Sequence, residues 1–168
     1  SITTKLPEKE FGGMVSATVG NHSARIVKGT LTGGISDTLS FRVSASSNEM
    51  DGFTTNLLDG SDMNNRDRHA IRGQLMWEPS DDLSVRIIAD TSEIDEECCG
   101  AAMLQIGAYG PLLSFLAGGQ SAPVDPQSRN VYANYSPSNK LDGDGISMHI
   151  EYDLGFATLT SITAQLDQ

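Results

Sequence analysis

The chain has little cysteine, few basic residues and no long apolar run, and each shortage excludes a class of function. Its two cysteines, Cys98 and Cys99, are adjacent, so no Cys/His spacing suits a zinc site. The chain carries 11 Lys and Arg against 22 Asp and Glu, which gives a net charge of −11. Because so acidic a chain repels phosphate backbones, we expect no nucleic-acid partner.

The longest apolar-rich stretch, residues 101–119, is interrupted by glycine, proline and polar residues. A membrane-spanning helix needs about 20 consecutive apolar residues, so the sequence predicts none. We interpret residues 101–117 instead as a possible site for a short helix within a long loop. No basic start followed by an apolar core opens the chain, so an export signal is expected to lie outside it.

Motifs for catalysis and for cofactor binding are also missing. The sequence contains neither a Gly-x-Ser-x-Gly motif nor a phosphate-binding loop with its Lys-Ser/Thr ending. Its three histidines, His22, His69 and His149, are isolated from one another along the chain. We therefore expect no enzymatic activity, no cofactor and no metal ligand.

What the chain does have is a strong period of two. Around residue 85, Leu83, Val85 and Ile87 alternate with Ser84 and Arg86. Because successive side chains of a β-strand point to opposite faces, this pattern predicts a strand with one apolar and one polar face. Similar segments predict seven strands, at about residues 12–20, 24–33, 38–47, 67–78, 83–92, 144–153 and 156–166. The second and the seventh alternate less cleanly than the others.

The connections between these strands alternate in length. Short turns with typical turn residues follow the second, fourth and sixth strands. Long connections, residues 48–66 and 92–143, follow the third and fifth, and the first link fits neither group. In an antiparallel meander, odd and even links lie at opposite ends, so we expect both long loops together, opposite the short turns. This is the pattern of outer-membrane barrels.

Three aromatic residues, Trp77, Tyr152 and Phe156, lie next to the predicted short turns. This position is typical of the aromatic girdle at a membrane interface, and equally of aromatic side chains that cover a soluble core. The alternation does not decide which face meets lipid, because a soluble sheet with one exposed face has the same pattern. The polar face predicted from the sequence carries large side chains that fit either a water-filled lumen or solvent, namely Arg42, Arg72, Arg86, His149 and Glu151.

Several segments, in order along the chain, resemble TonB-dependent receptors of the outer membrane. The opening Ser1-Ile2-Thr3-Thr4-Lys5-Leu6-Pro7 is similar to the end of their plug domain, and Phe11-Gly12-Gly13-Met14-Val15 to their first barrel strand. The most similar stretch is Ile71-Arg72-Gly73-Gln74-Leu75-Met76-Trp77-Glu78-Pro79-Ser80-Asp81-Asp82-Leu83. The segment 153–163 is similar to a later hairpin. The resemblance spans most of the chain apart from residues 92–140.

The resemblance implies an all-β fold, a location and a function. Residues 1–11 would be the end of the plug or its linker, and residues 12–168 the N-terminal part of a transmembrane β-barrel. The family's barrel has about 22 strands closed around a plug, so a chain with seven would be a fragment without the plug and its TonB-contacting segment. The implied function is uptake of a scarce solute, such as a ferric siderophore, across the outer membrane of a Gram-negative cell. Its partners would be outer-membrane lipid, the solute and, through the missing plug, the TonB system.

Two other classes remain open: a soluble extracellular β-sandwich that binds carbohydrate or protein, and a passive outer-membrane porin. The alternating link lengths favour either membrane class over the sandwich. The plug-like opening of the chain favours the receptor over the porin.

Cys98 and Cys99 fall in the long connection of residues 92–143, which this topology places outside the cell. An oxidising exterior favours a disulfide. Either the two cysteines pair with each other, or each pairs with a cysteine elsewhere in a longer protein. Free thiols and a metal site are the remaining interpretations, and we expect no catalytic role for the pair.

Overall fold

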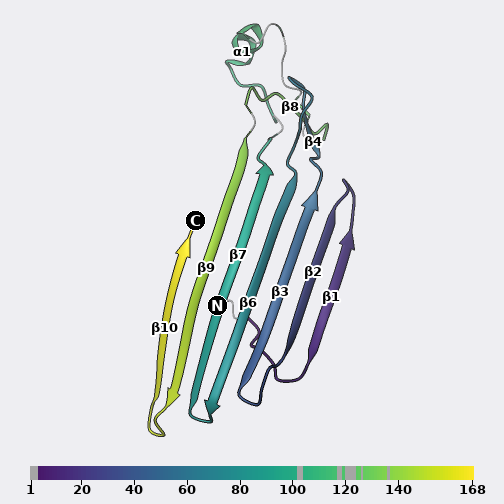
Figure 1. Ribbon diagram of the computed structural model, residues 1–168. Coiled ribbons are helices and arrows are strands. Elements are labelled where there is room, and N and C mark those ends of the chain that lie inside the picture. Colours follow the sequence, from purple (N-terminus) through teal and green to yellow (C-terminus); the bar gives the residue numbers. More distant parts are fainter. Residues whose placement is uncertain (1–3, 102–103, 117–118, 120–123, 126, 136) are drawn as a thin grey trace.

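The computed structural model describes residues 4–101, 104–116, 119, 124–125, 127–135 and 137–168. Seven antiparallel strands form an open sheet in the order β1-β2-β3-β6-β7-β9-β10, which confirms the predicted up-and-down meander (Figure 1). These strands are β1 (Gly12–Val19), β2 (Arg25–Gly34), β3 (Leu39–Met50), β6 (Arg66–Ser80), β7 (Leu83–Glu97), β9 (Ser138–Asp153) and β10 (Thr158–Asp167). Strands β1 and β10 form its two edges. Of the plug-like opening, residues 1–3 lie outside the described part.

The short turns and the long connections lie at opposite ends of the sheet, as the alternation in link length predicts (Figure 1). The turns β2–β3, β6–β7 and β9–β10 share one end, which we call the turn end. Both long connections leave the other end, which we call the loop end. The β1–β2 turn, which the sequence did not assign, lies at the loop end, where Asp51 N donates a hydrogen bond to His22 O over 2.9 Å.

Three strands extend further toward the loop end than the sequence predicts. Strand β3 ends at Met50, β7 ends at Glu97, and β9 begins at Ser138. The long connections are therefore residues 51–65 and 98–137, shorter than the predicted 48–66 and 92–143.

These extensions were missed because each contains a single apolar residue, Met50, Ile94 or Leu141, which is too few to mark a period. Cross-strand ion pairs accompany the backbone ladder there. Lys140 Nζ lies 2.8 Å from Asp95 Oδ2, and the Arg68 guanidinium pairs with the Glu96 carboxylate. Ladder hydrogen bonds and charge pairing therefore continue the sheet beyond its apolar part.

A second sheet of three strands joins the two long connections. It consists of β4 (Thr54–Asn56), β5 (Asp62–Met63) and β8 (Asn130–Val131) in the order β5-β4-β8. Strand β8 pairs with β4 in parallel. Strands of two or three residues are too short to show a period. The helix α1 (Gly110–Leu116) lies within residues 101–117, where the sequence permits a short helix. Within the described residues, no helix is both long enough and apolar enough to cross a membrane.

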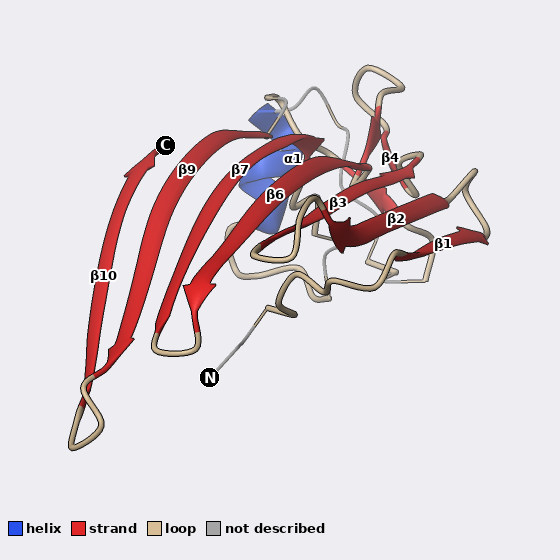
Figure 2. Cartoon of the chain, turned by 60° about the horizontal axis from the view of Figure 1, so that its bottom comes forward, coloured by secondary structure: helices blue, strands red, loops and turns tan. Residues whose placement is uncertain are grey.

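The described part of the chain buries few apolar side chains. The buried hydrophobic residues are Met63 and Val131, in the small sheet, and Ile88, in the large one. The large sheet, which is curved (Figure 2), therefore has no apolar core of its own. What each face of this sheet contacts therefore decides how the sheet is stabilised.

Candidate functional site

The two faces of the large sheet have opposite chemistry. Leu75 on β6 pairs in register with Phe41 and Ile87, whereas the preceding residue, Gln74, pairs with Arg42. The register puts the alternating apolar residues of these strands on one face, here called the apolar face: Val43, Leu75, Trp77, Val85, Ile87, Ile150 and Tyr152. It puts the large polar side chains on the other, the polar face: Arg42, Arg72, Arg86, His149 and Glu151. The predicted division of the strands is thus confirmed.

None of the residues that the structure describes covers the apolar face. Leu75, Trp77 and Ile146 keep 43%, 47% and 55% of their surface exposed, and Val15 keeps 80%. Soluble monomers rarely expose a contiguous apolar patch of more than a few hundred Å², whereas this face spans several strands. Burial of such a side chain is worth about 1.5–3 kcal/mol. An apolar partner would therefore stabilise this face.

From β9 to β2 the apolar face ends toward the loop end in polar or charged residues, and this boundary runs obliquely across the strands. One row of register partners shows the slope. From β9 to β1 the row consists of Asp142, Glu93, His69, Ser47, Val27 and Ala17. The same row therefore changes from acidic at one side of the sheet to apolar at the other.

The slope of the boundary follows from the register. On β9 the last apolar residue before the acidic ones is Ile146, whose row reaches Gly13 on β1. On β1 the apolar residues continue to Val19, at the strand's end. At about 3.4 Å per residue and about 4.8 Å per strand, the boundary shifts by about 20 Å over about 24 Å. It makes an angle of about 40° with the rows.

The three predicted interface aromatics lie at the turn end of the sheet. Trp77 and Tyr152 are on the apolar face and about half-exposed, and Phe156 is 88% exposed. Phe156 lies in the β9–β10 turn, because β10 begins at Thr158 rather than at residue 156. The structure thus groups the three at one margin of the apolar face.

Strand β10 departs from the pattern. Ile162 pairs with His149 and Leu166 with Gly145, so both apolar residues lie on the polar face. Ser161 and Thr163 lie on the apolar face instead. This is the strand whose register the sequence left ambiguous, and we have no physical account of the reversal at this edge.

The N-terminal arm, residues 4–10, crosses the polar face. Arg42, which is buried, donates from Nε to Leu6 O over 2.8 Å and from Nη2 to Glu8 Oε1 over 3.0 Å. Gln74 donates from Nε2 to Lys5 O over 3.2 Å. The polar side chains of the sheet thus bind main-chain carbonyls and a carboxylate of the chain itself, while the opposite face stays bare.

Beside this arm the polar face contains a hollow of about 610 Å³ between the arm and strands β2, β3, β6 and β7. Its charged and amide-bearing lining residues are Lys5, Lys28, Arg42, Arg72, Gln74 and Asp90. A hollow formed by four strands leaves no local signal in the sequence, so only the polar-face positions of Arg42 and Arg72 were predicted.

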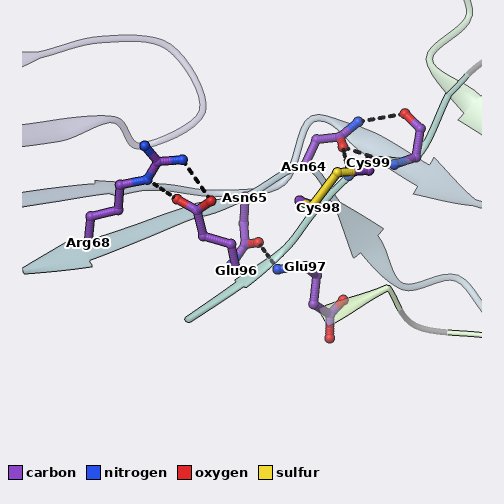
Figure 3. Close-up of a disulfide and its surroundings, with 8 residues drawn as sticks. Asn64, Asn65, Arg68, Glu96, Glu97, Cys98 and Cys99 are labelled. Atoms are coloured by element: carbon purple, nitrogen blue, oxygen red, sulfur yellow. Dashed lines mark hydrogen bonds and ion pairs between the residues drawn. A yellow bond between two sulfur atoms is a disulfide. The ribbon is translucent and has the colours of Figure 1, made fainter. Parts of the chain in front are cut away.

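At the loop end, a disulfide joins Cys98 to Cys99 directly after β7 (Figure 3). Cys99 has φ = 79°, a left-handed conformation that non-glycine residues rarely adopt. Cys99 N and Gly100 N both donate to Asn64 Oδ1, over 2.8 and 3.1 Å. Asn64 Nδ2 donates in turn to Gly100 O over 2.9 Å and to Thr54 Oγ1 over 2.8 Å. We call this arrangement the Asn64 clasp.

A second asparagine joins the same two connections further on. Asn56 is 2% exposed, donates from Nδ2 to Ala133 O over 2.8 Å and accepts from Ala133 N over 3.0 Å. Together with the β4–β8 pairing, these contacts tie residues 51–65 to the connection of residues 98–137 at two places. Asn64 holds its start, at Cys99 and Gly100, and Asn56 holds its later part, at Ala133. We call the combined unit the loop cap. Neither asparagine was predicted as a functional residue, since isolated Asn residues carry no pattern in the sequence.

The Arg68–Glu96 ion pair lies next to the Asn64 clasp (Figure 3). Arg68 Nη2 lies 2.9 Å from Glu96 Oε2, and Glu96 is buried with 4% of its surface exposed. Hydrogen bonding to the Arg68 guanidinium lowers the pKa of the Glu96 carboxyl, against the opposing effect of burial. Glu96 is therefore held as a carboxylate two residues before the disulfide.

Within the described residues, no group of three or more His, Cys, Asp or Glu side chains is arranged to hold a metal ion. Comparison of the chain with models of protein families, with curated proteins and with solved structures finds no match.

Proposed function

We propose that the large sheet is part of the wall of an outer-membrane β-barrel, with its apolar face toward lipid and its polar face toward the lumen. The oblique boundary of the apolar face carries this proposal. Strands of such barrels tilt by about 35–45° from the barrel axis, so a flat lipid layer crosses their register rows at that angle. The boundary slope of about 40° agrees with such a tilt.

The height of the apolar face supports the same proposal. On β7, apolar-face residues run from Leu83 to Thr91 before the acidic Glu93. That stretch of about nine residues is what a tilted strand needs to cross the hydrocarbon layer. Trp77, Tyr152 and Phe156 would then lie at the periplasmic interface, and the loop cap would lie outside the cell.

We further propose that this wall belongs to a TonB-dependent receptor, which takes up a scarce solute such as a ferric siderophore with energy supplied through TonB. The path of the N-terminal arm supports this choice over a passive porin. In such a receptor, the chain passes from the plug inside the lumen to the first barrel strand. An arm that crosses the polar face before β1, held by Arg42 and Gln74, fits that path.

A soluble β-sandwich would need a second sheet against the apolar face. Among the described residues, the other sheet is β5-β4-β8, which lies beyond the strand ends at the loop end (Figure 1). A covering sheet would also bury the whole face and would not require an oblique boundary. The observations therefore favour the barrel wall.

The function can be tested by uptake measurements on cells that carry or lack the gene encoding this chain, each with and without TonB. The solutes would be a panel of ferric siderophores labelled with radioactive iron. We expect uptake of at least one to require both the gene and TonB. Uptake that needs the gene but not TonB would instead support a passive porin. Uptake that depends on neither would contradict a transport role for these solutes.

A further inference from the structure

We propose that a contact between His22 and Arg129 is a pH-sensitive latch, closed when His22 is neutral and open when it is protonated. Arg129 Nη1 lies 3.1 Å from His22 Nε2. His22 lies in the β1–β2 turn, and Arg129 lies in the second long connection, directly before β8. This contact, here called the His22–Arg129 latch, therefore joins the turn to the loop cap. The proposal does not depend on the proposed function, because it concerns contacts within the loop end alone.

The chemistry of the two side chains fixes the protonation state of the latch. A guanidinium has only N–H donors and no acceptor. Its contact with His22 Nε2 therefore requires a free lone pair on that nitrogen, which a neutral imidazole can offer. A protonated imidazole carries N–H donors on both ring nitrogens. It would leave the Arg129 guanidinium without an acceptor and would place a second positive charge beside it.

Main-chain contacts hold both partners in position. His22 has φ = 56° and Arg129 has φ = 54°. Both residues are thus in the left-handed region, which persists only where surrounding contacts maintain it. Asp51 N donates to His22 O, and Thr55 N donates to Arg129 O, each over 2.9 Å. The first long connection therefore supports the backbone on both sides of the latch.

The ring of Phe53 lies next to both side chains of the latch. Its centroid is 6.0 Å from the centroid of the His22 ring and 5.7 Å from Arg129 Cζ, which lies over the ring. A guanidinium at this distance from an aromatic face is attracted to it. Arg129 therefore loses its contact with Phe53 if it turns away from a protonated His22.

Within the part of the chain that the structure describes, no ion pair joins a carboxylate to His22 or to Arg129. The elements that adjoin the turn carry three other charged residues. Asp51 follows β3, and Arg25 and Glu49 are register partners on β2 and β3. These three keep their charge between about pH 5 and 8, where histidine is the side chain that ordinarily changes its charge. His22 is thus the group of this region that responds to pH.

An open latch should release the turn and leave the rest of the loop cap closed. The Asn64 clasp and the contacts between Asn56 and Ala133 contain no group that titrates between about pH 5 and 8. The β1–β2 hairpin forms one edge of the large sheet, so β1 has a neighbouring strand on one side only. Protonation should therefore loosen the turn of this edge hairpin against the cap.

The test is amide hydrogen exchange of the full chain in neutral detergent micelles, at about pH 7.5 and about pH 5. Exchange rates are corrected for the intrinsic effect of pH. The amides of Asp51 and Thr55 report on the latch, because they donate to His22 O and Arg129 O. Their protection should fall by about twofold to tenfold at the lower pH, as expected for the loss of one hydrogen bond.

The amides of Cys99 and Ala133 serve as internal controls, because they donate to the side chains of Asn64 and Asn56. Their protection should be the same at both pH values. A fall there as large as the fall at residues 51 and 55 would contradict the latch, because the whole loop cap would then open together.

Variants separate the latch from general effects of pH. His22→Gln supplies a neutral acceptor that does not titrate, so protection at residues 51 and 55 should stay high at both pH values. Arg129→Met removes the donor, so protection should be low at both. His149 Nδ1 lies 3.3 Å from Arg86 Nη2 in the large sheet. His149→Gln is therefore the matched control and should show the same fall as the parent.

Two results would overturn the proposal. One is protection at residues 51 and 55 that does not change with pH in the parent. The other is a fall of equal size in the parent and in His22→Gln, since the response would then come from another group.

Discussion

Single residues determine how the loop cap is held. Asn64 has φ = 62° and Cys99 has φ = 79°, so two non-glycine residues in left-handed conformations face each other across the Asn64 clasp. Such conformations persist only where surrounding contacts maintain them. Here the contacts are the four hydrogen bonds of the Asn64 side chain and the disulfide that follows β7.

We predict that Cys98→Ser/Cys99→Ser loosens the loop cap and leaves the large sheet in place. Without the disulfide, the backbone at residue 99 is free to leave the left-handed region, and the two amide contacts to Asn64 weaken. Amide hydrogen exchange should accelerate in residues 51–65 and 98–101 but not in β1, β2 or β10. Reduction of the parent chain with a dithiol should give the same pattern.

The proposed receptor should retain most of its solute uptake in this variant, because the disulfide lies in the loop cap, after the end of β7, and not among the strands of the large sheet. Complete loss of uptake, with normal assembly and surface expression, would show a larger role for the pair. Unchanged exchange in both loop segments would contradict the bracing role itself.

The Arg68–Glu96 pair gives a prediction about pH. Because Arg68 lowers the folded-state pKa of Glu96, ionised Glu96 stabilises the folded loop end. That contribution is complete above the unfolded-state value of about 4.3 and is lost as the pH falls through the lowered folded value. Arg68→Met should destabilise this region by about 1–3 kcal/mol at pH 7, since it leaves a buried carboxylate without its partner.

The measurement is the free energy of local opening, from exchange of amides near Glu97. Arg68→Lys, which keeps the charge, should lower this free energy less than Arg68→Met does. The difference in the free energy of local opening between the parent and Arg68→Met should shrink below about pH 4. A difference that stays constant down to pH 2 would contradict the assignment to Glu96.

At the scale of elements, the strands and their two faces could be predicted from the sequence wherever one face of a strand is apolar. The segments around Leu75 and Val85 alternate, so their strands and faces follow from the period of two. The extensions near Met50 and Glu97 were missed because one apolar residue in each, Met50 or Ile94, cannot show a period. The strands of the small sheet were missed because they are too short, and β8 joins β4 only after a long intervening connection.

Strand β9 provides a matched test of the two faces. Met148 and Ser147 are adjacent, with Met148 on the apolar face and Ser147 on the polar face. We predict that Met148→Arg impairs insertion of the chain into phospholipid vesicles. The free energy of the inserted state should become less favourable by about 2–4 kcal/mol if that position lies near the bilayer centre. Ser147→Arg should insert like the parent. The readout is the fraction of protein that resists extraction with alkaline carbonate. Equal insertion of the two variants would contradict the lipid-facing assignment.

At the scale of the whole molecule, the arrangement of the strands carries more information than any single site. The meander and the positions of long and short links were predictable, because each depends on patterns within a few dozen residues. The slope of the apolar boundary, the hollow and the Asn64 clasp were not, because each depends on the register between strands. Register places Asp142 in the same row as Ala17, although the two residues lie far apart in the sequence.

The central claim is that the apolar face contacts lipid along an oblique boundary, and spin labels on the full chain in phospholipid bilayers test it most directly. Labels at residues 75, 85 and 150 should respond to oxygen dissolved in the lipid and not to a water-soluble nickel complex. Within one register row, a label at residue 17 should behave in the same way, whereas a label at residue 93 should respond to nickel. Nickel access at 75, 85 and 150, or equal behaviour at 17 and 93, would contradict the account.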